Sequence, residues 1–304
     1  MALASRPHML SHLLAEPRPP QRVVVLGSAG FIGRGVAAAA SGKGWTCLAL
    51  SRKDVDLADP GAAETLRPLL KPGDSLVVAA ALTPDRGRDV ATLMTNLRMA
   101  EALSKVLGDA ACAQVVYLSS DAVYDGAQPL ISEGVAPSPT DLYSLMHVAR
   151  ERILAHAAGA SGIPYCGLRP SAVMGPGDTH NSYGPNRFIR SALKDRRIKL
   201  FGGGEEMRDH AFVEDVVALV TLVLEHRSAG VLNAASGQSV SFHELAGQIA
   251  ALVSGGVELE NLPRSGPITH RHFDTTNRTR AFPRFRPTRL EEALERTVAG
   301  LRLG

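Results

Sequence analysis

Three glycines at fixed spacing constrain this chain more than any other feature of its sequence. The segment Gly27-Ser-Ala-Gly30-Phe-Ile-Gly33 follows an apolar β-branched run at 22–26 and leads into an alanine-rich stretch typical of a helix. Here Gly27 permits a tight turn, Gly30 lets the backbone approach a pyrophosphate, and Gly33 allows close contact between helix and sheet. The pattern predicts a dinucleotide-binding turn with the helix N-terminus facing the phosphates. We expect the turn to contact the cofactor through Gly27, Ala29, Gly30, Phe31, Ile32 and Gly33.

Apolar runs alternate with helical stretches from residue 22 onward. Candidate strands occupy 22–26, 46–50, 75–79, 114–118 and 165–168, and alanine- and leucine-rich segments separate them. Short apolar strands joined by helices predict a parallel sheet that is covered on both faces. The fold class is therefore α/β, a Rossmann-type doubly wound parallel sheet. After Arg169 the texture becomes rich in glycine, proline and polar residues, which predicts a smaller C-terminal substrate lobe over the carboxyl edge of the sheet.

The expected domain organisation follows from these changes of texture. Residues 1–21 include Pro17, Pro19 and Pro20 and have no continuous apolar segment, so we interpret them as a disordered leader rather than a signal peptide. Residues 22–170 form the dinucleotide-binding Rossmann domain. Residues 171–304 form mainly the substrate lobe, with about 205–240 returning to the Rossmann domain.

Composition excludes several classes of partner. The chain has 33 basic and 30 acidic residues, a balance that does not suggest a nucleic-acid partner. No run approaches the roughly 18 apolar residues needed to span a membrane. Three cysteines without metal-ligand spacing indicate buried thiols in a reducing compartment, hence the cytoplasm. His270 and His272 lack a third ligand in the sequence pattern, so we expect no metal.

The end of the second strand discriminates between nicotinamide cofactors. An acidic residue there binds the 2′-hydroxyl of NAD, whereas cationic residues accommodate the 2′-phosphate of NADP. This strand ends in Ser51-Arg52-Lys53. Because a guanidinium can bind phosphate through two hydrogen bonds, Arg52 favours NADP(H). NAD(H), with a solvated Arg52-Lys53 pair, is the alternative.

Taken together, the motifs of this chain resemble those of the extended short-chain dehydrogenase/reductases. Within that family the closest resemblance is to the NAD(P)-dependent nucleotide-sugar epimerases, dehydratases and 4-keto-reductases. The segments that carry it, besides the glycine turn, are Asp56-Leu57, Ala79-Ala80-Ala81, Asn96, Ser119-Ser120 with Tyr124, Tyr143, Arg169-Pro170, Gly175-Pro176-Gly177, Arg208-Asp209 and Phe212-Val213 with Asp215. They span nearly all of the chain after Arg22.

The resemblance implies hydride transfer at a sugar carbon of a nucleoside-diphosphate sugar. Tyr143 takes the place of the tyrosine that exchanges the hydroxyl proton, and Ser120 that of the residue that binds the same substrate oxygen. The resemblance further implies cofactor contacts from Ser51, Arg52, Asp56, Leu57, Ala79, Ala80, Ala81, Asn96, Tyr143 and His147. The family often forms dimers, so a homodimer is compatible with it.

One position departs from the family pattern. His147 stands four residues after Tyr143, where the family has a lysine that stabilises the tyrosine phenolate and holds the nicotinamide ribose. A histidine of ordinary pKa is mostly neutral at physiological pH. Three interpretations stay open: His147 binds the ribose and partly replaces the lysine, Arg150 on the same helix face supplies the charge, or turnover is lost. A solvated surface side chain is the simplest expectation for Arg150.

The remaining motif residues narrow the reaction and the substrate contacts. Dehydratases of the family carry an acid pair after the serine, but here Ala122 follows Asp121, which disfavours dehydration. Asp121 either orients substrate or caps a turn. Arg208 matches the diphosphate-binding arginine of the family. The predicted substrate contacts are Ser120, Asp121, Asn181, Asn186 and Arg208.

Three functions stay open at this point. Since reductases exchange NADPH whereas the epimerases retain NAD, Arg52 favours hydride transfer at a 4-keto carbon. A nucleotide-sugar epimerase with retained NAD is the first alternative. The second is a catalytically impaired NADP(H)-binding regulatory protein, which the loss of the lysine at His147 would suit.

Overall fold

The computed structural model describes residues 9–108, 112–126, 128–181, 184–264 and 266–302. Its centre is a seven-stranded sheet with the order β1-β10-β6-β5-β4-β2-β3. Every neighbouring pair is parallel except β1 and β10. The strands are β1 (Ser11–His12), β2 (Arg22–Leu26), β3 (Cys47–Leu50), β4 (Asp74–Val78), β5 (Gln114–Leu118), β6 (Tyr165–Pro170) and β10 (Ser228–Ala234). The predicted Rossmann-type sheet is confirmed.

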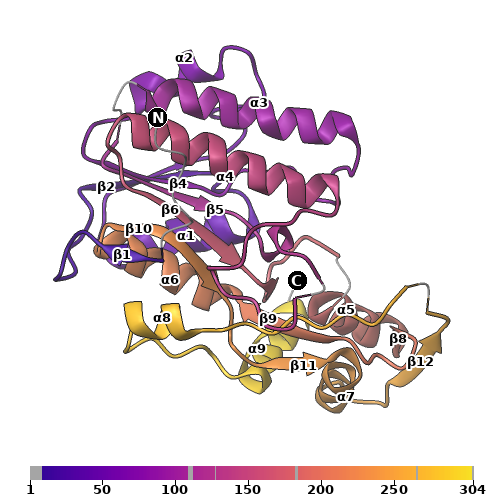
Figure 1. Cartoon of the computed structure of the whole chain (residues 1–304). Helices are drawn as coiled ribbons and strands as arrows, with labels where there is room; N and C mark the ends of the chain where they lie inside the picture. Colours follow the sequence, from indigo (N-terminus) through magenta and orange to yellow (C-terminus); the bar gives the residue numbers. More distant parts are fainter. Residues whose placement is uncertain (1–8, 109–111, 127, 182–183, 265, 303–304) are drawn as a thin grey trace.

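Helices cover both faces of this sheet, as the near-continuous burial of its strands requires. On one face lie α2 (Ala62–Leu66), the short η1 (Arg67–Leu69), α3 (Val90–Leu107) and α4 (Leu142–Ala160), and on the other α1 (Phe31–Gly42) and α6 (Val213–Glu225) (Figure 1). Valines on successive positions of β2 point to opposite faces and enter two separate buried clusters. The two hydrophobic clusters therefore sandwich the sheet and fix its carboxyl edge.

The smaller lobe is built after β6 from short sheets and helices. Its strands are β7 (Ala172–Met174), β8 (Arg197–Phe201), β9 (Met207–Phe212), β11 (Ser239–Ser241) and β12 (Glu258–Leu262), with helices α5 (Pro185–Asp195), α7 (Phe242–Leu252), α8 (Thr276–Ala281) and α9 (Leu290–Arg302). β11, β9 and β7 form one sheet and β12 pairs with β8. This lobe has its own apolar core, which includes Phe188, Phe212 and Phe242. Between the lobe segments, α6 and β10 run back to the main sheet.

The expectation of a disordered leader over residues 1–21 is wrong for residues 9–21. Ser11 and His12 form β1, which extends the main sheet against β10, and Leu10 is buried. His12 also contacts the Ser228 hydroxyl at 2.8 Å and the Ala281 carbonyl at 2.9 Å. The prolines that suggested disorder lie after this strand, where they do not interrupt a ladder. Residues 1–8 lie outside the described part of the chain.

Helix α4, which carries Tyr143 and His147, is fixed at its start and along its length. Asp141 and Ser144 form a reciprocal capping box, with Asp141 accepting from the Ser144 amide at 2.7 Å. Farther along, Glu151 makes a two-pronged buried ion pair with Arg169 of β6, at 2.8 and 2.6 Å. This ion pair joins α4 to a strand of the main sheet, so it holds the helix face that bears residues 143, 147 and 150 against the sheet.

Candidate active site

The glycine turn between β2 and α1 has the geometry that a bound pyrophosphate requires. Gly27 has φ +87°, and a Cβ there would lie 2.7 Å from the Ala80 nitrogen; a Cβ on Gly33 would lie 2.2 Å from the Gly27 carbonyl oxygen. Among the residues that the structure describes, no side chain caps the start of α1, and its first turn carries no acidic residue. The amides of that turn are thus available to an anion. The residues present fit a dinucleotide cofactor.

The segment after β3 carries the cation that we expect beside the cofactor ribose. The Arg52 side chain is 77% exposed, and its guanidinium pairs with the Asp56 carboxylate at 2.9 Å. Ser51 donates to Asp54 through both its amide and its hydroxyl, at 2.8 and 2.7 Å, which orders the turn. Leu57, an expected cofactor contact, directs its side chain into the core. Any contact that Leu57 makes with cofactor must therefore use its backbone.

Asn96 of α3 fixes the loop that follows β4. Its amide oxygen accepts from Leu82 N at 2.9 Å, and its amide nitrogen donates to Leu82 O at 3.0 Å. The same oxygen also accepts from Arg150 at 3.0 Å. Asn96 is only 1% exposed. Its two hydrogen bonds with Leu82 hold the end of the loop that contains Ala79-Ala80-Ala81. This arrangement supports an indirect role, rather than the direct cofactor contact expected from the sequence.

Ser120 and Tyr143 meet at the carboxyl end of β5. Ser120 caps η2 (Asp121–Val123) by accepting from the Ala122 amide at 3.1 Å. Burial raises the pKa of the Tyr143 phenol to about 12, although a hydrogen bond with the Ser120 side chain lowers it. The phenol is therefore protonated at neutral pH. The structure thus brings together the two residues that the sequence pairs as proton donor and oxygen-binding hydroxyl.

His147 lies beneath Tyr143 and is neutral. Its ring is 3% exposed and makes an edge contact with the Tyr143 ring, with centroids 4.7 Å apart. Burial, followed by the nearby charge of Arg150, lowers the pKa of His147 to about 3. Its Nδ1 bonds the Tyr117 hydroxyl at 2.8 Å, and its Nε2 has no partner within the described residues. A protonated His147 cannot therefore substitute for the lysine at physiological pH.

Arg150 is not the solvated side chain that we expected. It has no exposed surface, donates to Ala80 O at 2.7 Å, and stacks its guanidinium over the Tyr117 ring at 5.2 Å. Helical spacing places Arg150 on the same face as Tyr143. That face is covered by Ala80, in the loop after β4, and by Asn96 of α3. Sequence periodicity shows which face a residue is on and not what covers that face.

Asp121 is tied to the smaller lobe by an arginine that the sequence did not indicate. Arg271 donates to the Asp121 carbonyl at 2.8 Å and to its carboxylate at 3.1 Å. Burial raises the pKa of Asp121, while Arg271 opposes that rise. Asp121 therefore has a larger role than a turn cap. Because 150 positions separate the two residues, no local motif could have indicated this pair.

Arg208 of β9 lies close to the same group. Its guanidinium donates to the carbonyl and hydroxyl of Thr269 at 2.6 and 2.9 Å. Burial, and secondly the like charge of Arg271, lowers the pKa of Arg208. Arg208 and Arg271 are thus two neighbouring cations, and the carboxylates of Glu206 and Asp121 also act on Arg208.

The two asparagines proposed for substrate binding are placed differently. Asn186, at the start of α5, is buried, and its amide oxygen and nitrogen both bond the backbone of Gly175, at 3.2 and 2.9 Å. Its expected role as a substrate contact is a misassignment, because the amide already holds the glycine turn after β7. Asn181 is exposed and contacts Arg190 at 3.4 Å.

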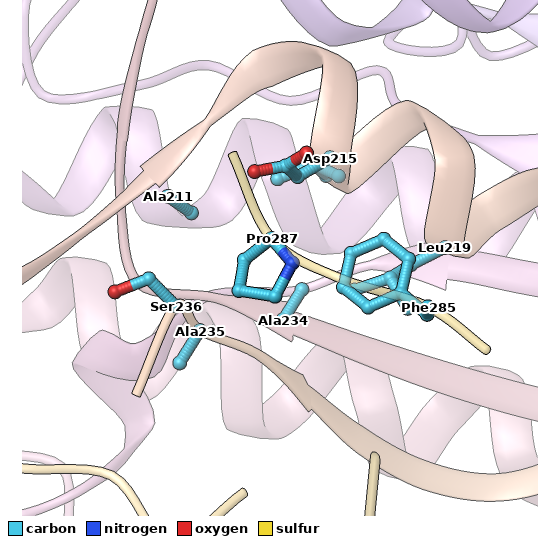
Figure 2. Close-up of a pocket in the computed structure, with 9 residues that line it drawn as sticks. Ala211, Asp215, Leu219, Ala234, Ala235, Ser236, Phe285 and Pro287 are labelled. Atoms are coloured by element: carbon cyan, nitrogen blue, oxygen red, sulfur yellow. The ribbon is translucent and has the colours of Figure 1, made fainter. Parts of the chain in front are cut away.

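A separate small pocket lies where the C-terminal segment crosses α6 and β10. Figure 2 shows the rings of Phe285 and Pro287 in the middle of this pocket, with Asp215 on one side and Ala234 on the other. The Asp215 carboxylate is satisfied by the amide and hydroxyl of Thr288, both at 2.8 Å. We assign this pocket to packing of the chain end against α6.

Within the described ranges, every helix is too short or too polar to cross a bilayer. The same ranges hold no grouping of three or more His, Cys, Asp or Glu side chains suited to a metal ion.

Comparison with known proteins identifies the class to which this fold and site belong. The family model described as the NAD dependent epimerase/dehydratase family matches residues 23–235. The ADP-L-glycero-D-manno-heptose-6-epimerase of Thiobacillus denitrificans is 26% identical over 254 residues, covering 74% of this chain and 76% of that protein. This chain therefore belongs to the NAD dependent epimerase/dehydratase family, and the resemblance inferred from its motifs is confirmed.

Solved structures agree with the assignment. MoeE5 in complex with UDP-glucose and NAD is 25% identical, with a TM-score of 0.79 over 93% of this chain and 99% of that one. RMD from Pseudomonas aeruginosa complexed with NADPH is 24% identical, with a TM-score of 0.81 over 93% and 100% of the two chains. The second likeness supports the fold. The class that these findings define is the NAD dependent epimerase/dehydratase family.

Proposed function

We propose that this protein is an NADP(H)-dependent reductase that transfers hydride to the 4-keto carbon of a nucleoside-diphosphate sugar. In this reaction Tyr143 gives its phenolic proton to the carbonyl oxygen, and Ser120 donates a hydrogen bond to the same oxygen. The bound nicotinamide supplies the hydride. The remaining residues bind and orient the two ligands.

The observation that carries the proposal is the protonation state of Tyr143. Its pKa is raised to about 12 by burial, and His147 below it is neutral. A protonated phenol is ready to act as the general acid that reduction of a ketone needs. An epimerase begins by removing a proton from a sugar hydroxyl, a step that needs the phenolate. The protonated phenol therefore supports reduction of the substrate.

The cofactor and substrate assignments rest on charge. The amides at the start of α1 would hold the pyrophosphate, and Arg52 would exchange its exposed contact with Asp56 for a 2′-phosphate. On the substrate side, Arg208 and Arg271 would face the diphosphate of a nucleotide sugar. The relatives named in the previous section support this substrate class, since MoeE5 is solved with UDP-glucose.

The first test measures cofactor binding and then turnover. Calorimetric titration of cofactor-stripped protein should show NADPH binding at least tenfold tighter than NADH, about 1.4 kcal/mol. A panel of 4-keto nucleotide sugars is then screened for NADPH oxidation. Tyr143→Phe and Ser120→Ala should each reduce kcat by about a hundredfold or more while NADPH affinity is kept. Turnover that survives in Tyr143→Phe would contradict the proposal.

An epimerase with retained NAD is the second candidate, favoured by the heptose-6-epimerase relative. The two functions differ in what the purified protein carries. An epimerase is expected to retain NAD through purification and to interconvert sugar epimers without added cofactor. If neither NADPH nor NADH binds, both enzymatic proposals fail and the regulatory alternative gains support.

A further inference from the structure

Arg150 is a buried cation without an acidic partner. Its side chain has no exposed surface, and among the described residues no carboxylate lies within ion-pair distance of its guanidinium. Its partners are the neutral Asn96 amide and Ala80 carbonyl, while its Nε has no acceptor in that part of the chain. Taking an unpaired charge out of water costs free energy. A negative charge that forms on a neighbouring side chain would offset this cost for Arg150.

Tyr143 is the neighbouring group that can become negative during the proposed reaction. It lies on the same face of α4, two turns before Arg150. The other charges that act on its phenol are Asp121 from η2 and Asp141 at the helix N-cap, and both disfavour the phenolate. Arg150 is the cation that acts in the opposite direction. A phenolate at Tyr143 would thus depend on Arg150 for its electrostatic stabilisation.

His147 lies between these two residues but contributes no charge. The Tyr117 hydroxyl is buried, and within the described residues it bonds His147 Nδ1. If Tyr117 accepted a hydrogen bond from Nδ1–H, its own O–H and the bare Nε2 would both lack partners among these residues, whereas with the proton on Nε2 only that N–H does. Tyr117 therefore donates to Nδ1, and the single ring proton of neutral His147 sits on Nε2. This arrangement fixes the ring as a neutral dipole under Tyr143.

We propose that Arg150 is the positioning residue that stabilises the Tyr143 phenolate, in place of the lysine that the family pattern has at position 147. The inference rests on the proposed function, in which Tyr143 releases its proton to the substrate oxygen. The O–H bond of Tyr143 breaks, a new O–H bond forms on the substrate, and the phenolate remains on the helix face that carries Arg150. Arg150 keeps all of its protons throughout and acts through its charge.

The test measures the ionisation of Tyr143 directly. A fluorinated tyrosine is incorporated at position 143, where electron withdrawal by fluorine brings titration into a pH range in which the protein stays folded. Its 19F resonance then reports the pKa at a single site in the full-length protein. Arg150→Met should raise this pKa by about one unit or more, whereas Arg150→Lys should keep it near the wild-type value. His147→Lys in the Arg150→Met background should lower the pKa at position 143 again.

A matched control separates charge from structure. Arg227 also binds a neutral carbonyl, that of Ala113, at 3.0 and 2.8 Å, so Arg227→Met should lower the melting temperature without moving the Tyr143 pKa. The proposal is overturned if Arg150→Met leaves that pKa unchanged in a folded protein. It is equally overturned if Arg150→Lys and Arg150→Met raise the pKa by the same amount.

The readout uses neither substrate nor cofactor, so the two proposals can fail separately. A pKa that responds to Arg150, together with no turnover of any 4-keto nucleotide sugar, would reject the reductase and retain the electrostatic role. Turnover of a 4-keto nucleotide sugar, together with a Tyr143 pKa that does not change in the Arg150 variants, would retain the reductase and reject the electrostatic role of Arg150. On an active substrate, Arg150→Met should lower kcat by tenfold or more with little change in KM, because its effect is on proton transfer.

Discussion

Arg271 donates to both the backbone carbonyl and the carboxylate of Asp121, at 2.8 and 3.1 Å. The arginine belongs to the segment that follows β12, whereas Asp121 directly follows Ser120. Arg271 also contacts the Tyr124 carbonyl at 3.3 Å. The Arg271 guanidinium thus joins the smaller lobe to the turn that follows Ser120.

Removal of Arg271 should destabilise the protein more at neutral pH than in acid. Burial raises the pKa of Asp121 in the folded protein, so protonation of this carboxyl favours folding, and that contribution is lost as pH rises through the folded pKa. Arg271→Met raises this pKa further and should cost about 2 kcal/mol at neutral pH. Urea denaturation at about pH 7.5 and pH 4.5 measures the difference. The exposed Arg197, which pairs with Glu258, provides a control variant, and an equal loss at both pH values would contradict the assignment.

Substitutions in the glycine turn should separate close packing from helix propensity. An alanine at position 33 would place its Cβ 2.2 Å from the Gly27 carbonyl oxygen, whereas one at Gly42, in the same helix, meets nothing within 4 Å. Gly33→Ala should therefore cost roughly 2 kcal/mol or more and abolish measurable NADPH binding. Gly42→Ala should be neutral or stabilising by up to about 1 kcal/mol. Normal cofactor affinity in Gly33→Ala would show that the turn does not approach the ligand.

The role proposed for Arg52 predicts a change in selectivity rather than in overall binding. Arg52→Ala should weaken NADPH binding by about tenfold or more and leave NADH binding nearly unchanged, since only NADPH carries the 2′-phosphate. Asp56→Asn frees the guanidinium from its 2.9 Å ion pair and should strengthen NADPH binding. Lys53→Ala serves as the neighbouring control. A parallel loss of both cofactors in Arg52→Ala would assign the residue to the fold of the turn.

Two buried histidines should make the protein sensitive to acid. Burial, aided by Arg150 and Arg208 respectively, lowers the pKa values of His147 and His210 to about 3. The stability that each neutral ring contributes is present above its unfolded pKa near 6.5 and is lost as pH falls toward the folded value. Between about pH 6.5 and 4.5, each should account for a loss of about 2 kcal/mol. Replacing either His147 or His210 with Gln should flatten the fall in unfolding free energy over this range, and the exposed His243 provides the control.

Much of the main sheet could be predicted from local sequence. The strands expected at 22–26 and 114–118 coincide with β2 and β5, because buried parallel strands leave continuous apolar runs that need no knowledge of their neighbours. Residues 9–21 differ from the expectation. Residues 11–12 are polar and become a strand only because the edge of β10 is available to them, which is a tertiary property.

The same division applies to the site. The sequence by itself determined the glycine turn, which depends on residue type at short spacing, and its family resemblance indicated the Ser120–Tyr143 pair and the departure at His147. Only the tertiary structure decided that Asn186 is occupied by Gly175, that Arg150 is buried, and that Arg271 binds Asp121. Burial and the ion pairs formed across long loops depend on the whole packed chain. They therefore set the pKa values at this site, which residue identity alone does not.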